Sequence, residues 1–318
     1  MELPSNHVPD LWFPDGNVVI RVGERVCCVY KGFLASQSPV LSDMFSFPQP
    51  QSVDTYMGLP TVTFPDAEKD VEYWLKTLLI PGYFQIYPGT IEAKKLFAVL
   101  RLSHKYDVQY FRRCALQHLA RYYATDLDEQ CRLLRSKEEF NIEGSGNIRF
   151  ETDVYLLAFE TGTPWLIPSL TYTLHKYSSI IGHSIDHLAA CLSPFDLAKV
   201  WRIRGLVEKK IGMDSLVHAL DDNSVGCSKG MTCASDTCRL LTNLYRAYGA
   251  DPLGFSPPSV LSSALCSEAC SSCSAVLQER HRELCEAFWA ALPEQIGLGT
   301  WVELRAIKAR DLGQPTED

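Results

Sequence analysis

The stretch "KGFLASQSPVLSDMF", residues 31–45, places a Ser-Pro step between two apolar clusters. Ser38 is a good N-cap, and Pro39 suits the first helical position, where the N–H that proline lacks would have no intrahelical partner. The step therefore predicts the start of a second helix directly after a first. Because apolar residues flank it at helical spacing, we expect two short helices that meet at an angle, each with an apolar side.

The residues around this stretch alternate between strand and helix patterns. Residues 17–30, "NVVIRVGERVCCVY", predict two strands joined by a turn, and residues 61–66, "TVTFPD", predict a third strand. Residues 67–80, "AEKDVEYWLKTLLI", have the apolar spacing of an amphipathic helix. Two more helices are predicted within residues 90–123, the second starting at or near Asp107. The expected order is hairpin, helix pair, strand and helices.

This ordered set resembles a BTB/POZ domain, in the form typical of large fungal families. The most specific pieces are "DLWFPDGNVVIRV", residues 10–22, and "SPVLSDMFSFPQP", residues 38–50, and the resemblance covers residues 8–123. It implies an α+β fold in which a small β-sheet is flanked by helices. It also implies an interaction domain that self-associates or binds other proteins, so we expect protein partners and a homo-oligomer.

In BTB domains the matching helix pair lies near the surface used for self-association. Such a face needs apolar or aromatic anchors at its centre and polar residues around them. The alternative is that these apolar side chains belong to the core of their own domain. The candidate partner-binding residues, taken from the N-terminal segment and the helix pair, are Leu11, Trp12, Phe13, Phe33, Leu34, Val40 and Phe45.

The chain departs from the family pattern at positions that bear on its partners. Many BTB domains have an Asp at the start of the first strand and a His before the first helix, where this chain has Asn17 and Tyr30. Members that recruit a cullin-type ubiquitin ligase commonly carry a hydrophobic-x-Glu element after the helix ending in Met-Phe. Here residues 46–50 contain no acidic residue. The first expectation is therefore an interaction scaffold, with a substrate adaptor for a cullin-type ubiquitin ligase as the alternative.

Beyond residue 123 the pattern is mainly helical. We expect a helical extension over residues 124–220, with Thr125 or Asp126 as its first cap. Ser193-Pro194 repeats the Ser-Pro helix start.

The last part of the chain, residues 221–318, is expected to hold a cysteine-rich loop and C-terminal helices. Within it, residues 282–307, "RELCEAFWAALPEQIGLGTWVELRAI", predict an apolar helix, a turn at Leu292-Pro293 and a further amphipathic segment.

The cysteines of this last part raise the question of a metal. Cys270-x-x-Cys273 would place two sulfurs on one helical face, and four thiolates drawn from both groups of cysteines could close a tetrahedral zinc site. The candidate ligands are Cys227, Cys233, Cys270 and Cys273, with Cys238 and Cys266 as reserves. The other interpretation is reduced, partly buried thiols and no cofactor. A zinc-stabilised regulatory protein is therefore a second alternative function.

Composition and charge argue against several classes of function. The 318 residues carry 30 Lys and Arg against 38 Asp and Glu, and the excess acid falls in residues 126–318. No basic face is evident, so nucleic acid is not an expected partner. There is no basic leader and no long apolar run, so we expect an intracellular protein of the cytoplasm or nucleus that does not enter a membrane. Twelve cysteines in a reducing compartment are more often thiols or metal ligands than disulfides.

Catalysis has little support in the sequence. Residues 182–187, "GHSIDH", place His183 and His187 four residues apart, as in zinc proteases, but Ser184 stands where those enzymes have a general-base Glu. Solvated helix residues explain the pattern better. We therefore expect a protein that is not an enzyme.

Overall fold

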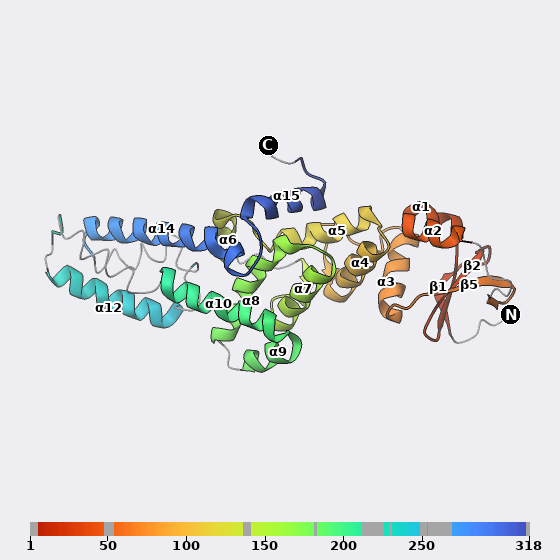
Figure 1. Ribbon diagram of the computed structural model, residues 1–318, viewed down its shortest axis with the longest axis horizontal. Helices are drawn as coiled ribbons and strands as arrows, with labels where there is room; N and C mark the ends of the chain where they lie inside the picture. The colour runs from red at the N-terminus through yellow and green to blue at the C-terminus, as the bar shows by residue number, and fades with distance from the viewer. Residues whose placement is uncertain are drawn as a thin grey trace. The chain divides into compact units, whose positions relative to one another are not determined.

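The computed structural model of the protein describes residues 6–47, 54–135, 141–180, 183–211, 226–228, 231–248, 253 and 269–315 (Figure 1). The chain forms two compact units. The first unit comprises residues 1–121, 140–145 and 311–314, and the second comprises residues 122–139, 146–310 and 315–318. The expected mixed fold, with a small sheet near the N-terminus and mainly helices elsewhere, is confirmed. The boundary between 124–220 and 221–318 stays a prediction.

The predicted hairpin forms the centre of the sheet. Strands β2 (Val18–Val22) and β3 (Arg25–Val29) pair in antiparallel register, and the chain turns at Gly23, whose φ of 54° suits a residue without a side chain. The third predicted strand is β5 (Leu59–Thr63), which lies parallel to β2. These three strands therefore form where β-branched residues indicated them.

Two outer strands were not expected. Strand β1 (His7–Trp12) pairs in parallel with β3, and β4 (Thr55–Tyr56) pairs with β5, so the order is β1-β3-β2-β5-β4. Although β1 and β4 form the two opposite edges of the sheet, side chains from the two strands contact each other. The hydroxyl of Tyr56 lies 3.0 Å from Nε2 of His7, whose ring also stacks on Trp12 at 3.7 Å between centroids. The sheet therefore curves until its outer strands are bridged by aromatic side chains.

The Ser-Pro step separates two helices as predicted, α1 (Lys31–Gln37) and α2 (Pro39–Ser46). The Oγ atom of Ser38 accepts a hydrogen bond of 3.0 Å from the backbone N–H of Leu41 and donates one of 2.5 Å to the backbone carbonyl of Tyr106. Ser38 is buried, so a single hydroxyl caps α2 and fixes the corner to a distant part of the unit.

The departures at Asn17 and Tyr30 have local partners. Asn17 Oδ1 accepts a 2.8 Å hydrogen bond from the N–H of Lys31, the first residue of α1, and the Tyr30 hydroxyl donates one of 2.8 Å to Asp15. The neutral side chain of Asn17 thus satisfies one backbone donor at the start of α1.

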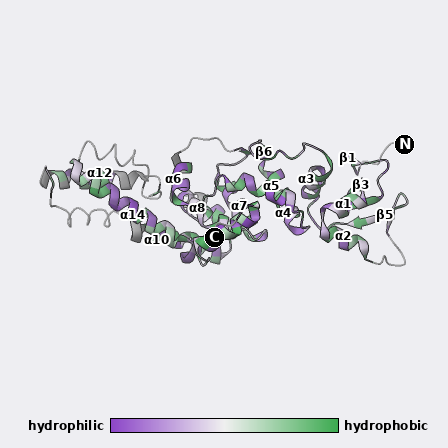
Figure 2. Cartoon of the chain, turned by 90° about the horizontal axis from the view of Figure 1, so that it is seen from above, coloured by the Kyte–Doolittle hydropathy of each residue, from purple (hydrophilic) through white to green (hydrophobic). Residues whose placement is uncertain are grey.

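The remaining helices of the first unit are α3 (Glu68–Leu79), α4 (Ala93–Lys105) and α5 (Gln109–Ala120). Their inner faces pack with the sheet around Trp74, whose indole N–H donates to the hydroxyl of Ser103 at 3.1 Å. Figure 2 shows hydrophilic and hydrophobic residues mixed along α4 and α5, as expected of helices with one buried face. The short strands β6 (Ile91–Glu92) and β7 (Ile142–Glu143) pair in parallel.

The predicted helix start at or near Asp107 is confirmed, although Asp107 itself lies before the helix. Asp107 adopts a left-handed conformation with φ of 53°, and Val108 is the residue that precedes α5, without a side-chain cap. The chain therefore turns sharply through Asp107 before the helix begins.

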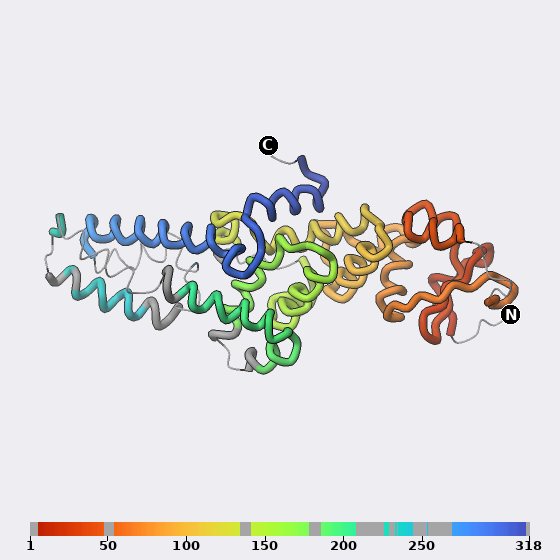
Figure 3. Tube along the Cα trace, viewed as in Figure 1, coloured from red at the N-terminus to blue at the C-terminus, as the bar shows by residue number. Residues whose placement is uncertain are grey.

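The second unit is built from helices (Figure 3). Asp126 and Ser193 cap two of them as predicted, since Asp126 Oδ1 accepts from the N–H groups of Asp128 and Glu129, and Ser193 Oγ accepts from that of Asp196. The described helices are α6 (Leu127–Arg135), α7 (Ile148–Glu160), the 3-10 turn η1 (Pro164–Leu166), α8 (Ile167–Ile180), α9 (His183–Cys191), α10 (Pro194–Ile211), α12 (Met231–Tyr248), α14 (Ser271–Gln295) and α15 (Trp301–Leu312). Of α15, residues 301–310 belong to this unit.

The predicted turn at Leu292-Pro293 is wrong, because α14 continues through Pro293 to Gln295. A proline leaves the carbonyl four residues earlier without its helical donor. That carbonyl belongs to Trp289, and it accepts the indole N–H of Trp301 at 2.6 Å. The two indole rings also stack, with centroids 4.9 Å apart. A side chain from α15 thus replaces the missing backbone donor.

Candidate metal centre and interaction face

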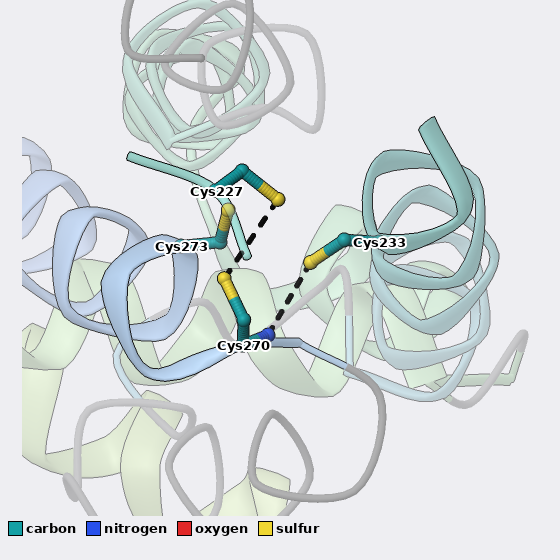
Figure 4. Close-up of side chains that lie close together, drawn as sticks. All are labelled: Cys227, Cys233, Cys270 and Cys273. Carbon is teal, nitrogen blue, oxygen red and sulfur yellow. Dashed lines mark hydrogen bonds between the residues drawn. The ribbon is translucent and has the colours of Figure 1, made fainter. Parts of the chain in front are cut away.

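The structure brings together the four predicted cysteine ligands. Cys227 lies in the segment 226–228, Cys233 in the first turn of α12, and Cys270 and Cys273 at the start of α14 (Figure 4). Their four sulfur atoms all lie within 4.8 Å of one another. Segments far apart in the sequence therefore converge on one group of thiols.

Of the two reserve ligands, Cys238 lies further along α12 and is not a member of this group, although it is the nearest cysteine in sequence to Cys233. The other reserve, Cys266, lies outside the described residues.

Both helices that supply sulfurs begin at the cluster. Cys270 is the N-cap residue of α14, and its backbone N–H donates to Sγ of Cys233 at 3.3 Å. Helix N-termini and free backbone N–H groups favour negative charge, which on a cysteine means the thiolate. Cys233 and Cys270 are buried, whereas Cys227 and Cys273 are half-buried. Two of the four cysteines are therefore buried, and the other two keep part of their surface exposed.

The thiols of this cluster differ in acidity. Backbone N–H groups of Cys273 and Ser228 stabilise the thiolate of Cys270 and lower its pKa to about 5. Burial, together with the neighbouring sulfurs, raises the pKa of Cys273. One sulfur is thus held as an anion while a neighbour keeps its proton, and a bound cation would displace that proton.

The spacing of the sulfurs suits a metal ion better than a disulfide. The sulfurs of Cys227 and Cys270 are 3.8 Å apart. A Zn–S bond of about 2.3 Å in a regular tetrahedron places neighbouring sulfurs about 3.8 Å apart. A disulfide would require about 2.05 Å. The arrangement can therefore bind a thiophilic divalent cation through four protein ligands.

The predicted interaction residues separate into two groups. Leu11, Leu34 and Phe45 lie in the core of the first unit, where Leu11 and Leu34 have no exposed surface. Their burial leaves them little area to offer a partner. In contrast, Phe33 of α1 and Val40 of α2 are exposed to 40% and 41%.

Trp12 and Phe13 are half-buried against their own unit. The ring of Trp12 stacks on His7, and the ring of Phe13 lies 5.0 Å from that of Tyr30. These two residues therefore stabilise the outer strand and offer only part of their surface.

One exposed aromatic residue was not predicted. Phe47 follows α2 and is exposed to 70%, the largest exposure among the large apolar residues of the α1–α2 region. The sequence signal was available, since Phe47 is the apolar residue directly after the helix. Polar side chains of Ser36, Gln37 and Asp43 are also exposed there. We define the α1–α2 face as Phe33, Val40 and Phe47 with these polar neighbours.

Among the described residues, the histidine pattern at residues 183–187 does not form a metal site. The side chain of His183 lies outside the described residues, and the ring of His187 lies 3.8 Å from Sγ of the exposed Cys191. Among the described residues, the four-cysteine cluster is the group whose ligand atoms converge as a metal would require.

Comparisons with known proteins give no further assignment. No protein-family model matches the chain, and no curated protein matches it. Among the described helices, none combines the length and apolar composition needed to cross a membrane.

Proposed function

We propose that the protein is an intracellular interaction scaffold whose BTB/POZ-like first unit binds a second copy of the chain through the α1–α2 face. The exposure of Phe33 and Val40 on two consecutive helices, and of Phe47 directly after the second helix, carries this proposal. Apolar side chains that gather on a surface and are rimmed by polar ones are the usual composition of an interface centre.

The local structure beneath the face supports this role. Ser38 anchors the corner between α1 and α2 to the carbonyl of Tyr106, and Leu34, Leu41 and Phe45 fill the core below. The exposed residues therefore sit on a rigid support, which lowers the entropic cost of binding. The element order of hairpin, helix pair, strand and helix also agrees with the resemblance to BTB/POZ domains.

Light scattering coupled to size-exclusion chromatography of the full chain tests the proposal. We expect a dimer for the wild-type chain and a monomer for the double variant Phe33→Asp/Val40→Asp, because desolvating carboxylates in an apolar interface is costly. Ile86→Asp, at a position exposed to 52% outside the face, is the matched control and should remain a dimer. A wild-type chain that stays monomeric at high concentration would contradict self-association.

The cullin adaptor remains the alternative use of the same unit. Residues 46–50 lack the acidic residue that cullin-binding members commonly carry. The structure describes Ser46 and Phe47 of this stretch, and both are exposed. Co-purification of a cullin with the full chain, lost in Phe47→Asp, would favour the adaptor over the homotypic scaffold.

We also propose Zn²⁺ as the ion of the four-cysteine cluster, which makes the protein a zinc-stabilised scaffold. Thiolates are preferred ligands of structural zinc, the sulfurs of Cys227 and Cys270 have the separation expected around a tetrahedral zinc ion, and all four sulfurs lie within 4.8 Å of one another. Elemental analysis of protein purified without chelators should find one Zn²⁺ per chain. Its absence would remove the ion from the proposal but leave the α1–α2 face unaffected.

A further inference from the structure

The described side chains of helix α12 bury little apolar surface. The structure describes the side chains of Cys233 and of residues 235–243 in this helix, and among these only Cys233, Thr237 and Leu241 are buried. They are four residues apart and form one narrow stripe. Leu241 is the single large aliphatic side chain in that stripe, so apolar burial of these residues contributes little to holding the helix.

The stripe also contains a buried polar group, which lowers the free energy gained by packing this face of α12. The hydroxyl of Thr237 is buried and has no hydrogen-bond partner within the described part of the chain. Burying a hydroxyl without a partner opposes docking. Among the described elements, the closely packed pairs include α10 with α14 and α10 with α8, and none includes α12.

Helix α14 is held very differently. Its buried face runs along the helix, and Phe288 meets the ring of Tyr172 of α8 edge-on, with centroids 5.8 Å apart. The burial of this apolar face stabilises the position of α14 without a metal. The buried residues of α14 are Ser274, Leu277, His281, Leu284, Cys285, Phe288, Trp289, Leu292 and Pro293.

The cysteine cluster joins the weakly held helix to the strongly held one. Cys233 belongs to α12, whereas Cys270 and Cys273 belong to the start of α14, and Cys233 and Cys270 are 37 residues apart in sequence. Cys227 adds the segment that precedes α12. A tetrahedral ion bound by these four sulfurs would therefore cross-link all three segments.

We propose that the bound Zn²⁺, rather than apolar packing, docks α12 onto α14, so that this part of the protein is folded only when the metal is present. The inference rests on the zinc assignment proposed above and adds a consequence to it. Four protein ligands leave no open coordination position, so the ion acts as a structural cross-link and not as a catalyst. Metal binding supplies the free energy that orders the helix.

Hydrogen exchange measured by mass spectrometry on the full chain tests this inference. In the zinc-loaded protein, peptides from α12 should be protected. Removal of zinc with a chelator should speed their exchange by about tenfold or more, while peptides from α7 and α8 keep their protection. Adding Zn²⁺ back should restore the protection of α12. Co²⁺ added to the metal-free protein should give the absorption bands of a tetrahedral thiolate complex.

Two variants distinguish the loss of a zinc ligand from the general effect of a substitution in α12. Cys233→Ser should abolish stoichiometric zinc binding and reproduce the fast exchange of the metal-free protein. Cys238→Ser, a substitution in the same helix at a cysteine outside the cluster, is the matched control and should bind zinc and protect α12 normally. If Cys233→Ser is insoluble, the chelation experiment on the wild-type chain still decides the question.

The possible failures are distinguishable. Zinc that is bound, but whose removal leaves α12 protected, would overturn the docking inference and leave the zinc proposal standing. Loss of protection in α7 and α8 together with α12 would also overturn it, because the ion would then support the whole unit. Protein that binds neither Zn²⁺ nor Co²⁺ would overturn both, while the dimer measurement would still test the α1–α2 face.

Discussion

At the scale of single residues, Ser38 shows how one hydroxyl can serve two elements. It caps α2 and also donates to the carbonyl of Tyr106. We expect Ser38→Ala to lower the free energy of unfolding by about 1–3 kcal/mol, since it removes the cap and leaves a buried carbonyl unpaired. Urea denaturation checks this value. Ser46→Ala, which removes an exposed hydroxyl on the same helix, should change it by less than about 0.5 kcal/mol, and equal effects of the two would contradict this account.

A second residue-scale prediction concerns Glu151 of α7. Burial raises the pKa of this carboxyl to about 7, although the hydrogen bond from the Tyr123 hydroxyl, 2.8 Å long, acts in the opposite direction. The folded state therefore keeps a proton that the unfolded state loses near its ordinary value of 4.5. The stabilisation is complete below that value and is lost as pH rises to about 7.

The size of this effect follows from the two pKa values and amounts to about 3 kcal/mol. We expect Glu151→Gln, which keeps an acceptor for Tyr123 but cannot ionise, to lose less stability than the wild-type chain between pH 5 and pH 7. Unfolding curves at both pH values measure the difference. Parallel pH dependence in the two proteins would contradict an ionisation of Glu151 as its source.

At the scale of elements, the end of α14 depends on a bond between helices. The indole N–H of Trp301 supplies the donor that Pro293 cannot give to the carbonyl of Trp289. We expect Trp301→Phe to lower the free energy of unfolding by about 1–3 kcal/mol. Pro293→Ala restores a backbone donor, so it should stabilise the Trp301→Phe variant more than it stabilises the wild-type chain. A double-mutant cycle measures this coupling. Additive effects would contradict the idea that the Trp301 indole N–H replaces the backbone donor that Pro293 lacks.

The elements that could be predicted are those with a local chemical cause. Ser38-Pro39, Asp126 and Ser193-Pro194 mark helix starts because the capping bond lies within three residues of the cap. The continuation of α14 past Pro293 was missed because its cause is Trp301, a side chain on another helix. Strand β1 was missed because its residues, HVPDLW, include Pro9 and show no alternation of buried and exposed positions.

The candidate sites show the same limit. The Cys270-x-x-Cys273 spacing predicted one pair of the converging cysteines, whereas closeness in sequence to Cys233 does not separate Cys227, which joins the cluster, from Cys238, which does not. The α1–α2 face was harder to predict, because two helices of seven and eight residues are too short for apolar periodicity to separate Leu34 and Phe45 from Phe33 and Val40. Exposure depends on which neighbours cover each residue, and that is set by tertiary packing.

At the scale of the whole molecule, the protein combines two kinds of support. The first unit is held by an apolar core in which Trp74, Leu75 and Leu34 have no exposed surface. In the second unit, α14 has an extended buried face, whereas the described side chains of α12 bury one narrow stripe. We therefore expect association to depend on the first unit, and metal dependence to be confined to the second unit, which carries the cysteine cluster.

The curvature of the sheet limits how chains of this protein can add to one another. Exposed outer strands are templates for fibril-like growth, because their free N–H and C=O groups accept another strand. Here β4 has two residues, and β1 contains Pro9 and an irregular register. Neither presents a long regular ladder, and the bridge from His7 to Tyr56 draws them together. These two outer strands therefore offer little regular backbone to which a strand of another chain could add.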